Sequence, residues 1–260
     1  AGLLSGLQDP YSTYYTAEQY KELNTSNEGS YVGIGAVLQK DNDGGATVVQ
    51  LYEGGPGEQA GLKTGDVIKA IDGTDVTEKE TSDIASMVRD SEKDSVTLTI
   101  QRENEEKTQD IKVEIRDVEI KTVSHEMLSG DTGYIRISEF SEVTSDQYKK
   151  AFADLKSQGM KKLVVDLRDN PGGLLNTVCD ILRQILPEGL IVYTEDKNGK
   201  REEETCDGKN ELDMPMAVLV NGNSASASEI FAGAVKDYGI GTIVGTTTYG
   251  KGVVQTIQPL

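Results

Sequence analysis

The chain has 260 residues, 36% hydrophobic and 27% charged, and we expect a soluble globular protein with two or three cores. Its 44 acidic and 26 basic residues give a formal charge of −18, which repels phosphate backbones and argues against a nucleic-acid partner. No stretch approaches the roughly 20 consecutive apolar residues of a membrane-spanning helix.

Residues with versatile chemistry are scarce in this sequence. His125 is the only histidine, which argues against most His-dependent catalysis and His-rich metal sites. Cys179 and Cys206 are too few for a disulfide framework or a zinc cluster. A disulfide between them stays open, although we favour two inert thiols, and we expect no metal and no organic cofactor.

Residues 1–27 carry a short helical pattern rather than a domain. Pro10-Tyr11-Ser12 indicates a turn, and Thr16 is placed to cap a helix from Ala17 to about Leu23. The chain opens without the regions of a signal peptide and stops directly after a strand-like run. We therefore expect both ends to be internal to a longer protein.

Two further regions differ in their periodicity. From 28 to 118, short strands such as Val32–Leu38, Ala46–Leu51 and Val96–Arg102 surround a helix at Asp83–Arg89, which indicates a small, partly open β-barrel. From 119 to 260, strands and helices alternate, which predicts a mixed sheet covered by helices. The predicted elements there are strands at Tyr134–Ile137, Leu163–Leu167, Ala217–Val220 and Thr242–Val244, and helices at Ser145–Gln158, Leu174–Leu186 and Ser228–Lys236.

The segment from Gly245 to Lys251 fits the start of a phosphate-binding P-loop, G-x-x-x-x-G-K-[ST]. The last position fails, because Gly252 has no hydroxyl for Mg²⁺. The residues that follow, 253–257, alternate like a strand, whereas a P-loop opens a helix. We reject nucleotide binding, and Lys251 taken alone is a solvated surface residue.

A serine-rich segment, 221–230, lies between a buried strand and the helix that begins near Ser228. A hydroxyl at such a junction faces free N–H groups and the positive end of the helix dipole, which suits a nucleophile whose attack creates an oxyanion. Serines there also act as helix caps, a role we assign to Ser228, but three serines cannot all be caps.

A serine nucleophile needs a base beside it. His125 lies in a charged segment between two domains, which argues against a Ser-His-Asp set. A lysine can replace the histidine, because burial disfavours the ammonium and can lower a lysine pKa by several units. The run Asp166 to Gly173 follows another buried strand; it is either a plain turn or, with its paired glycines, a second source of oxyanion donors.

Together these motifs resemble the carboxyl-terminal processing peptidases, or tail-specific proteases, over nearly the whole chain. The motifs are Leu4-Ser5-Gly6-Leu7-Gln8-Asp9-Pro10-Tyr11-Ser12, Gly33-Ile34-Gly35, Ala60-Gly61-Leu62-Lys63-Thr64-Gly65-Asp66, Asp166-Leu167-Arg168-Asp169-Asn170-Pro171-Gly172-Gly173, Ser224-Ala225-Ser226-Ala227-Ser228-Glu229-Ile230 and Tyr249-Gly250-Lys251-Gly252 with Gln255 beyond. The last two, in this order and at this separation, are highly specific.

The resemblance implies a mixed α+β and α/β fold. A PDZ domain, a partly open β-barrel over 28–118, would join a crotonase-like (ClpP-like) α/β serine peptidase core over 119–260, truncated at its C-terminal end, with the helical segment 1–27 in front. It also implies that Ser226 is the nucleophile, that Lys251 is the general base, and that Gln255 orients the lysine.

The resemblance assigns supporting roles as well. The oxyanion hole would use the amide of Ala227 and one amide of the Gly172-Gly173 pair, for which we choose Gly172. Glu229 and Thr248 match positions that support the site.

In the PDZ domain the turn Gly33, Ile34 and Gly35 would capture the carboxylate of a substrate terminus, with preference for an apolar last residue. Family members usually have an N-terminal membrane anchor or signal and more structure after the lysine strand. We therefore place any membrane anchor outside this chain, leave a homo-oligomer open, and expect an extracytoplasmic location (cell envelope, periplasmic or secreted).

The function expected from these residues is that of a serine endopeptidase that cleaves proteins in their C-terminal regions through an acyl-enzyme. The alternative is a catalytically inactive PDZ adaptor that binds peptides on the same fold. The presence of Ser226, Lys251 and Gln255 together favours the enzyme, since a scaffold has no use for that trio.

Overall fold

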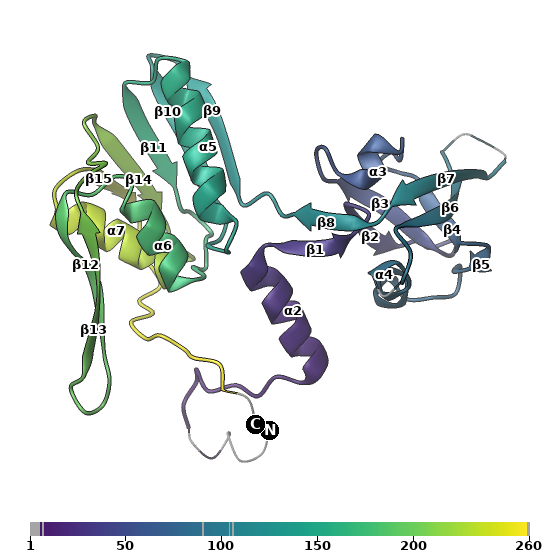
Figure 1. The fold of residues 1–260 in the computed structure, drawn as a ribbon, viewed down its shortest axis with the longest axis horizontal. Coiled ribbons are helices and arrows are strands. Elements are labelled where there is room, and N and C mark those ends of the chain that lie inside the picture. Colours follow the sequence, from purple (N-terminus) through teal and green to yellow (C-terminus); the bar gives the residue numbers. More distant parts are fainter. Residues whose placement is uncertain (1–5, 7, 90, 104, 106, 259–260) are drawn as a thin grey trace. The chain divides into compact units, whose positions relative to one another are not determined.

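The computed structural model, drawn in Figure 1, describes residues 6, 8–89, 91–103, 105 and 107–258. Within the N-terminal motif, Leu4, Ser5 and Leu7 lie outside the described residues. The chain forms two compact units: the smaller unit is 30–120, and the larger unit combines 1–29 with 121–260. No helix in the described part of the chain has both the length and the apolar character needed to cross a bilayer.

The smaller unit is an antiparallel sheet with two short helices. Its sheet runs in the order β2-β3-β4-β6-β7, with β5 on β4, and β1 pairs separately with β8. The bounds are β1 (Ser30–Gly33), β2 (Ala36–Lys40), β3 (Ala46–Leu51), α3 (Pro56–Gln59), β4 (Val67–Ile71), β5 (Thr74–Asp75), α4 (Thr81–Arg89), β6 (Ser95–Gln101), β7 (Gln109–Glu114) and β8 (Arg116–Glu119).

One predicted strand of the smaller unit is divided in the structure. The apolar run Val32–Leu38 was expected to be continuous, but the strands β1 and β2 are separated at Ile34 and Gly35. Gly35 has φ 71°, a conformation that favours glycine, and a Cβ there would lie 3.0 Å from the Pro56 ring. A turn thus interrupts the strand where the apolar pattern alone indicated none.

The larger unit contains a five-stranded sheet in the order β15-β14-β11-β10-β9 (Figure 1). Strands β10, β11, β14 and β15 are parallel, and β9 is antiparallel to β10. The bounds are β9 (Val123–Leu128), β10 (Thr132–Ile137), α5 (Thr144–Ser157), β11 (Lys162–Asp166), α6 (Leu175–Leu182), β12 (Glu188–Glu195), β13 (Arg201–Asp207), β14 (Met216–Val220), α7 (Ala227–Asp237) and β15 (Thr242–Gly245).

Helices cover this sheet and bury its apolar side chains. Helix α5 contacts β9 and β10, helix α7 contacts β15, and α6 contacts both helices. The strand residues Leu163, Val165 and Val218 are almost fully buried in the core that results. Cys179 and Cys206 are both free and buried, as the favoured interpretation of two inert thiols required.

The sequence prediction missed a hairpin and added a strand in the larger unit. Strands β12 and β13 pair antiparallel around a turn at 196–199, for which Asn198-Gly199 was an available signal. The alternating run 253–257 forms no strand, so that prediction was wrong. Alternation predicts which side chains would face the core, but a strand also needs a neighbouring strand to hydrogen-bond with.

The N-terminal helix α2 (Ala17–Glu28) belongs to the larger unit. The predicted cap is confirmed: Thr16 Oγ1 accepts the N–H of Gln19 at 3.2 Å, and Gln19 Oε1 accepts the N–H of Thr16 at 3.0 Å. The helix runs beyond the predicted end at Leu23. Its last turn is attached to the larger unit, where the Glu142 N–H donates to Asn27 O at 2.8 Å.

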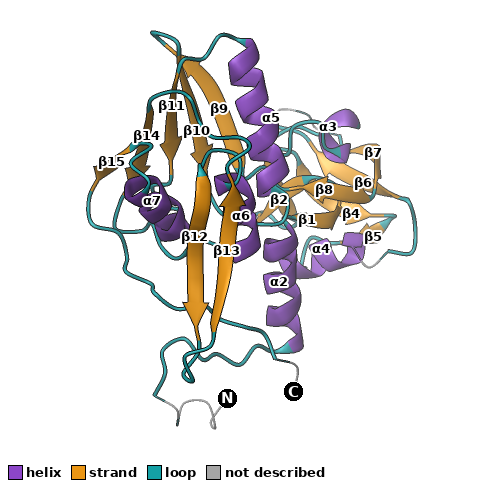
Figure 2. Cartoon of the chain, turned by 60° about the vertical axis from the view of Figure 1, so that its left-hand side comes forward, coloured by secondary structure: helices purple, strands orange, loops and turns teal. Residues whose placement is uncertain are grey.

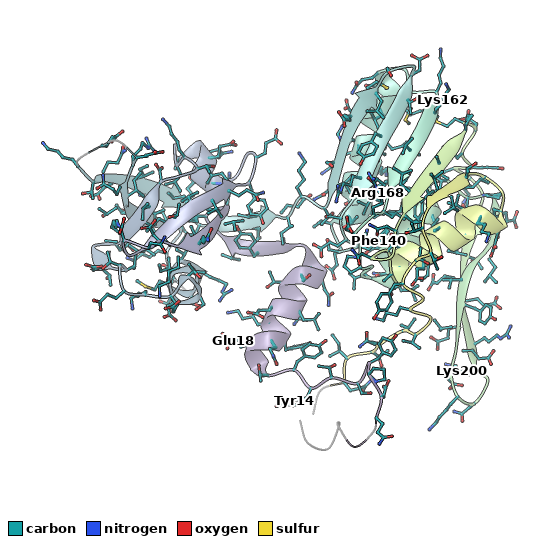
Figure 3. The ribbon with its side chains drawn as sticks, turned by 180° about the vertical axis from the view of Figure 1, so that it is seen from behind. Tyr14, Glu18, Phe140, Lys162, Arg168 and Lys200 are labelled. Atoms are coloured by element: carbon teal, nitrogen blue, oxygen red, sulfur yellow. The ribbon has the colours of Figure 1, made fainter. Side chains whose placement is uncertain are left out.

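Strand β11 ends on a buried charged residue, Asp166, close to the labelled Arg168 in Figure 3. Tyr134 donates its hydroxyl to Asp166 Oδ2 at 2.6 Å, and Arg168 donates from Nη2 to the same oxygen at 2.6 Å. Burial alone would raise the pKa of Asp166, but the Arg168 guanidinium and the Tyr134 hydroxyl oppose it and bring the pKa to about 2.

This carboxylate gives the larger unit a specific acid sensitivity. Because the pKa falls from 3.8 to about 2 on folding, the stabilisation is complete above the unfolded value and is lost as pH falls toward 2. It amounts to about 2 kcal/mol. In urea unfolding between pH 5 and 2, the wild type should lose about 2 kcal/mol more than Asp166→Asn. The exposed-site control Glu126→Gln should follow the wild type, and parallel pH curves for wild type and Asp166→Asn would contradict the assignment.

Candidate active site

Three loops of the larger unit meet at one edge of its sheet. They follow the strands β11, β14 and β15, which lie side by side in parallel (Figure 2). Because the carboxyl ends of parallel strands share one edge, the loops 167–174, 221–226 and 246–251 gather there. The predicted Ser226, Lys251 and Gly172 come from these three loops.

Ser226 stands between strand β14 and helix α7, at the N-cap position of the helix. Its backbone has φ 53° and ψ −114°, which is unusual for a residue with a side chain and costs on the order of 1–3 kcal/mol. A sharp strand-to-helix turn of this kind holds a serine at the exit of the sheet. Ser226 is half-buried there, while Ala225 and Ala227 on either side are buried.

The other two serines attach this turn to the loop after β11. Ser224 donates its hydroxyl to Leu167 O at 2.7 Å, and Ser228 donates to Asn170 O at 3.0 Å. The prediction that Ser228 caps the helix was wrong, because Ser228 lies inside the first turn of α7 and its hydroxyl binds a carbonyl outside the helix. Ser224 and Ser228 therefore fix the position of the turn that carries Ser226.

Glu229 connects the serine turn to the lysine loop. Its Oε2 accepts the backbone N–H of Ser226 at 2.8 Å and that of Lys251 at 2.9 Å. Its Oε1 accepts the hydroxyl of Thr248 at 2.8 Å and the N–H of Gly250 at 2.7 Å. Since Ser226 and Lys251 donate to the same oxygen, their backbone nitrogens lie no more than about 6 Å apart.

The same contacts keep the Glu229 side chain charged. Its burial raises the pKa, but the Thr248 hydroxyl and the three backbone N–H groups outweigh it and leave the pKa below the ordinary value. A carboxylate that accepts four hydrogen bonds stabilises the positions of all four donor groups, here three backbone N–H groups and one hydroxyl. Glu229 and Thr248 thus lie where the resemblance placed supporting residues.

Lys251 is half-buried, and its side chain contacts Gln255. The Lys251 Nζ donates to Gln255 Oε1 at 2.7 Å. Within the described residues, no hydrogen bond joins Lys251 Nζ to Ser226 Oγ. Glu229 therefore brings the backbones of Ser226 and Lys251 together, while the amine of Lys251 donates to Gln255.

Gly172 lies directly beside the serine turn. A Cβ on Gly172 would be 2.8 Å from Ser226 Cβ and 2.9 Å from the amide nitrogen of Ala227. The Ala227 N–H is in the first turn of α7, where helix amides have no partner inside the helix. The Gly172 N–H donates to Asn170 Oδ1 at 2.8 Å in this structure, so of the two predicted oxyanion donors it is the one already engaged.

Two other interpretations of the sequence do not fit the structure. His125 lies on β9, three strands away from β14 and thus roughly 14 Å from it, and contacts Asp154 at 2.8 Å. Residues 252–258, the described part of the chain after Lys251, form no helix, so the phosphate-binding interpretation lacks its structural basis. The described residues also contain no cluster of three or more His, Cys, Asp or Glu side chains arranged to hold a metal ion.

The predicted peptide-binding turn, Gly33 to Gly35, lies in the smaller unit between β1 and β2. Ile34 O accepts the N–H of Gly57 at 2.7 Å, and Gly35 O accepts the N–H of Tyr52 at 3.0 Å, so the carbonyls of the turn are fixed. Tyr31 packs against Gly33, and burial beside Tyr52 raises the pKa of Tyr31 to about 12. In the described sheet β2 is an edge strand, paired only with β3.

Sequence reasoning missed two residues of the site. Asn170 is fully buried; its Nδ2 donates to Ile137 O at 3.0 Å, and its carbonyl accepts Ser228 Oγ and the N–H of Ala225. An asparagine before Pro-Gly-Gly at a strand end was the available signal. Tyr11 contacts both Lys251 and Gln255; it lies in the N-terminal motif of the resemblance, but nothing in that motif indicated which residues it would contact.

Comparison with known families agrees with this geometry. The model of peptidase family S41 matches residues 131–260, and a PDZ domain model matches residues 47–102. The chain therefore belongs to peptidase family S41, and its smaller unit carries a PDZ domain. The resemblance to carboxyl-terminal processing peptidases and the mixed fold predicted from it are confirmed.

Several known proteins are similar to most of this chain. The probable CtpA-like serine protease of Staphylococcus aureus (strain N315) is 40% identical over 261 residues, which cover 99% of this chain and 52% of that protein. The corresponding Staphylococcus epidermidis protein is 37% identical over 260 residues, with the same coverage. The chain thus spans about half the length of the curated relatives it matches.

Solved structures show the same architecture. The photosystem II D1 C-terminal processing protease is 31% identical with a TM-score of 0.55, over 98% of this chain and 70% of that chain. The tricorn protease, 21% identical with a TM-score of 0.51 over 85% of this chain and 22% of that chain, shows the fold alone.

The Glu229 contacts lead to a prediction about charge. In Glu229→Gln, one of the two oxygens becomes an NH₂ group, which would face two donors whichever way the amide turns. Two hydrogen bonds are lost, and unfolding should become easier by roughly 2–4 kcal/mol. The thermal unfolding temperature should fall, whereas Glu126→Gln should leave it unchanged. A Glu229→Gln variant as stable as wild type would refute the bridging role.

Proposed function

We propose that this chain carries the catalytic centre of a serine endopeptidase in which Ser226 is the nucleophile and Lys251 the general base. The observation that supports it most is the shared oxygen of Glu229, which holds the backbones of both residues in one place. The membership in peptidase family S41 supports the same assignment.

The proposed reaction proceeds through an acyl-enzyme. The uncharged amine of Lys251 takes the proton of Ser226 Oγ while that oxygen attacks the carbonyl carbon of the substrate. The tetrahedral intermediate collapses when the C–N bond breaks, and the ammonium of Lys251 gives its proton to the leaving amine. Water then attacks the ester and loses a proton to the amine of Lys251. The ammonium returns that proton to Ser226 Oγ as the C–O bond breaks, which releases the acid and regenerates the free serine and the uncharged lysine.

Backbone amides would stabilise the negative charge that develops on the substrate oxygen. We assign this role to the N–H groups of Ala227 and Gly172, whose backbones lie beside each other and beside Ser226. The Gly172 N–H would have to leave Asn170 Oδ1 to take part. A small rotation of this glycine-rich turn would accomplish the exchange, because glycine tolerates many backbone conformations.

The lysine also has to change partner in this proposal. Gln255 holds the amine at 2.7 Å in the structure, and we assign it the role of orienting the amine between turnovers. A lysine side chain with four rotatable bonds can reach the neighbouring hydroxyl without any backbone change. Glu229 and Thr248 keep the loop in place while it does so.

The PDZ domain would select the substrates. The open edge of β2 can accept a peptide as an added strand, and the amides of the turn Gly33, Ile34 and Gly35 would receive its terminal carboxylate. Val37 on β2 is an exposed apolar side chain, which favours substrates with apolar C-termini. We propose cleavage in the C-terminal regions of such proteins, in an extracytoplasmic compartment.

The competing candidate is an inactive PDZ adaptor, and one variant separates the two. Wild-type protein should cleave casein, a disordered protein, and Ser226→Ala should lower the rate by at least about 10³-fold, because the nucleophile is gone while the fold is kept. Gel analysis of the fragments measures it, and Ser124→Ala on the exposed face of β9 is the matched control. Equal cleavage by wild type and Ser226→Ala would eliminate the proposal.

A second variant separates catalysis from binding. Lys251→Ala should lose turnover by at least about 100-fold, since the base is missing. It should keep the affinity of the PDZ domain for a labelled peptide with an apolar last residue, measured by fluorescence anisotropy. Weakened binding together with unchanged turnover would contradict this division of roles.

A further inference from the structure

The N-terminal segment reaches the proposed base from the opposite end of the chain. The Gln255 Nε2 donates to the backbone carbonyl of Tyr11 at 2.7 Å. The ring of Tyr11 lies under the side chain of Lys251, with Nζ 5.5 Å from the ring centroid. In Figure 1 the end of the chain, in yellow, runs beside the beginning, in purple, both within the larger unit.

A turn fixes Tyr11 in this position. The carboxylate of Asp9 accepts the N–H of Tyr11 at 3.1 Å and the hydroxyl of Ser12 at 2.6 Å. Tyr11 and Ser12 are half-buried, whereas residues 8–10 and 13–22 around them are exposed. Tyr11 thus loses part of its solvent exposure at the place where the segment meets Lys251 and Gln255.

The carbonyl of Tyr11 determines how the Gln255 amide faces the lysine. A backbone carbonyl only accepts hydrogen bonds, so the NH₂ group of Gln255 has to point to Tyr11. The amide oxygen is then the atom that faces Lys251, and it accepts the amine at 2.7 Å. Without the carbonyl of Tyr11, the amide could turn its NH₂ group toward the lysine and repel the ammonium.

The ring of Tyr11 adds a second contact that depends on charge. An aromatic face attracts an ammonium within about 6 Å of its centroid, a limit that the Nζ of Lys251 meets at 5.5 Å. In the proposed reaction Lys251 becomes charged when Ser226 attacks, so the ring stabilises the state that follows proton transfer.

We propose that Tyr11 is a positioning residue of the catalytic centre, acting through its ring on Lys251. This inference rests on the proposed function of that centre. It assigns the N-terminal segment a part in catalysis that the helical pattern of residues 1–27 did not indicate.

The test compares three variants in the full chain. Tyr11→Leu keeps the backbone carbonyl but lacks an aromatic face, and it should lower kcat for casein about two- to fivefold. Tyr11→Phe keeps the face and should restore kcat to near the wild-type value. Tyr14→Leu, at an exposed tyrosine of the same segment labelled in Figure 3, should leave kcat unchanged. KM, peptide affinity and the thermal unfolding temperature should stay the same in all three.

Each outcome decides the inference. If the wild type shows Ser226-dependent cleavage and Tyr11→Leu cleaves at the same rate, the role of the ring is overturned while the proposed function stands. The same holds if Tyr11→Phe does not restore the rate that Tyr11→Leu loses. A loss of kcat that follows a lowered unfolding temperature would overturn it too, because Tyr11 would then act on the fold. Absence of Ser226-dependent cleavage in the wild type would overturn the proposed function and this inference together.

Discussion

The candidate active site depends on one carboxylate. Glu229 lies in the first turn of α7 and accepts four hydrogen bonds. One carboxylate oxygen accepts the backbone N–H groups of Ser226 and Lys251, and the other accepts the Thr248 hydroxyl and the Gly250 N–H. Ser226 and Lys251 are 25 positions apart in the printed sequence and belong to different loops. Besides Glu229, the described contacts between the lysine loop and the serine turn include the Tyr249 N–H, which donates to Ser224 O at 3.0 Å, but Glu229 alone accepts from the backbones of both Ser226 and Lys251.

This arrangement has a physical logic that begins in the sheet. Parallel strands β11, β14 and β15 deliver three loops to one edge, but loops at an edge are not thereby fixed. Ser224 and Ser228 bind the serine turn to the loop after β11, and Glu229 binds it to the loop after β15. The serine turn is thus held from both sides, which is how its unusual backbone at Ser226 can persist.

Much of this was predictable because the signals are local. The largely apolar runs Leu163–Leu167 and Ala217–Val220 are typical of buried strands, and the loop 167–174 and the serine motif follow them. Thr16 predicted its helix start because a cap acts within one turn. The alternation of apolar and polar residues at 253–257 led to a wrong strand prediction, since the sequence of one segment does not show whether a neighbouring strand is there to pair with it.

The rest of the site was not predictable because its contacts are distant in sequence. Tyr11 and Gln255 are 244 positions apart, and neither residue carries a pattern that indicates the other. Asn170 acts through a buried side chain whose partner, Ile137, lies 33 positions away. The motifs led to the predicted site residues, and the structure was needed to show that Glu229, rather than a direct contact between their side chains, connects Ser226 and Lys251.

The most direct test of this account is the rate at which a fluorophosphonate labels the protein, because this reagent reacts with an activated serine. Peptide mapping should find the label on Ser226. The rate should fall by at least about 100-fold in Lys251→Ala. A label on another serine, or a rate that Lys251→Ala leaves unchanged, would contradict the account.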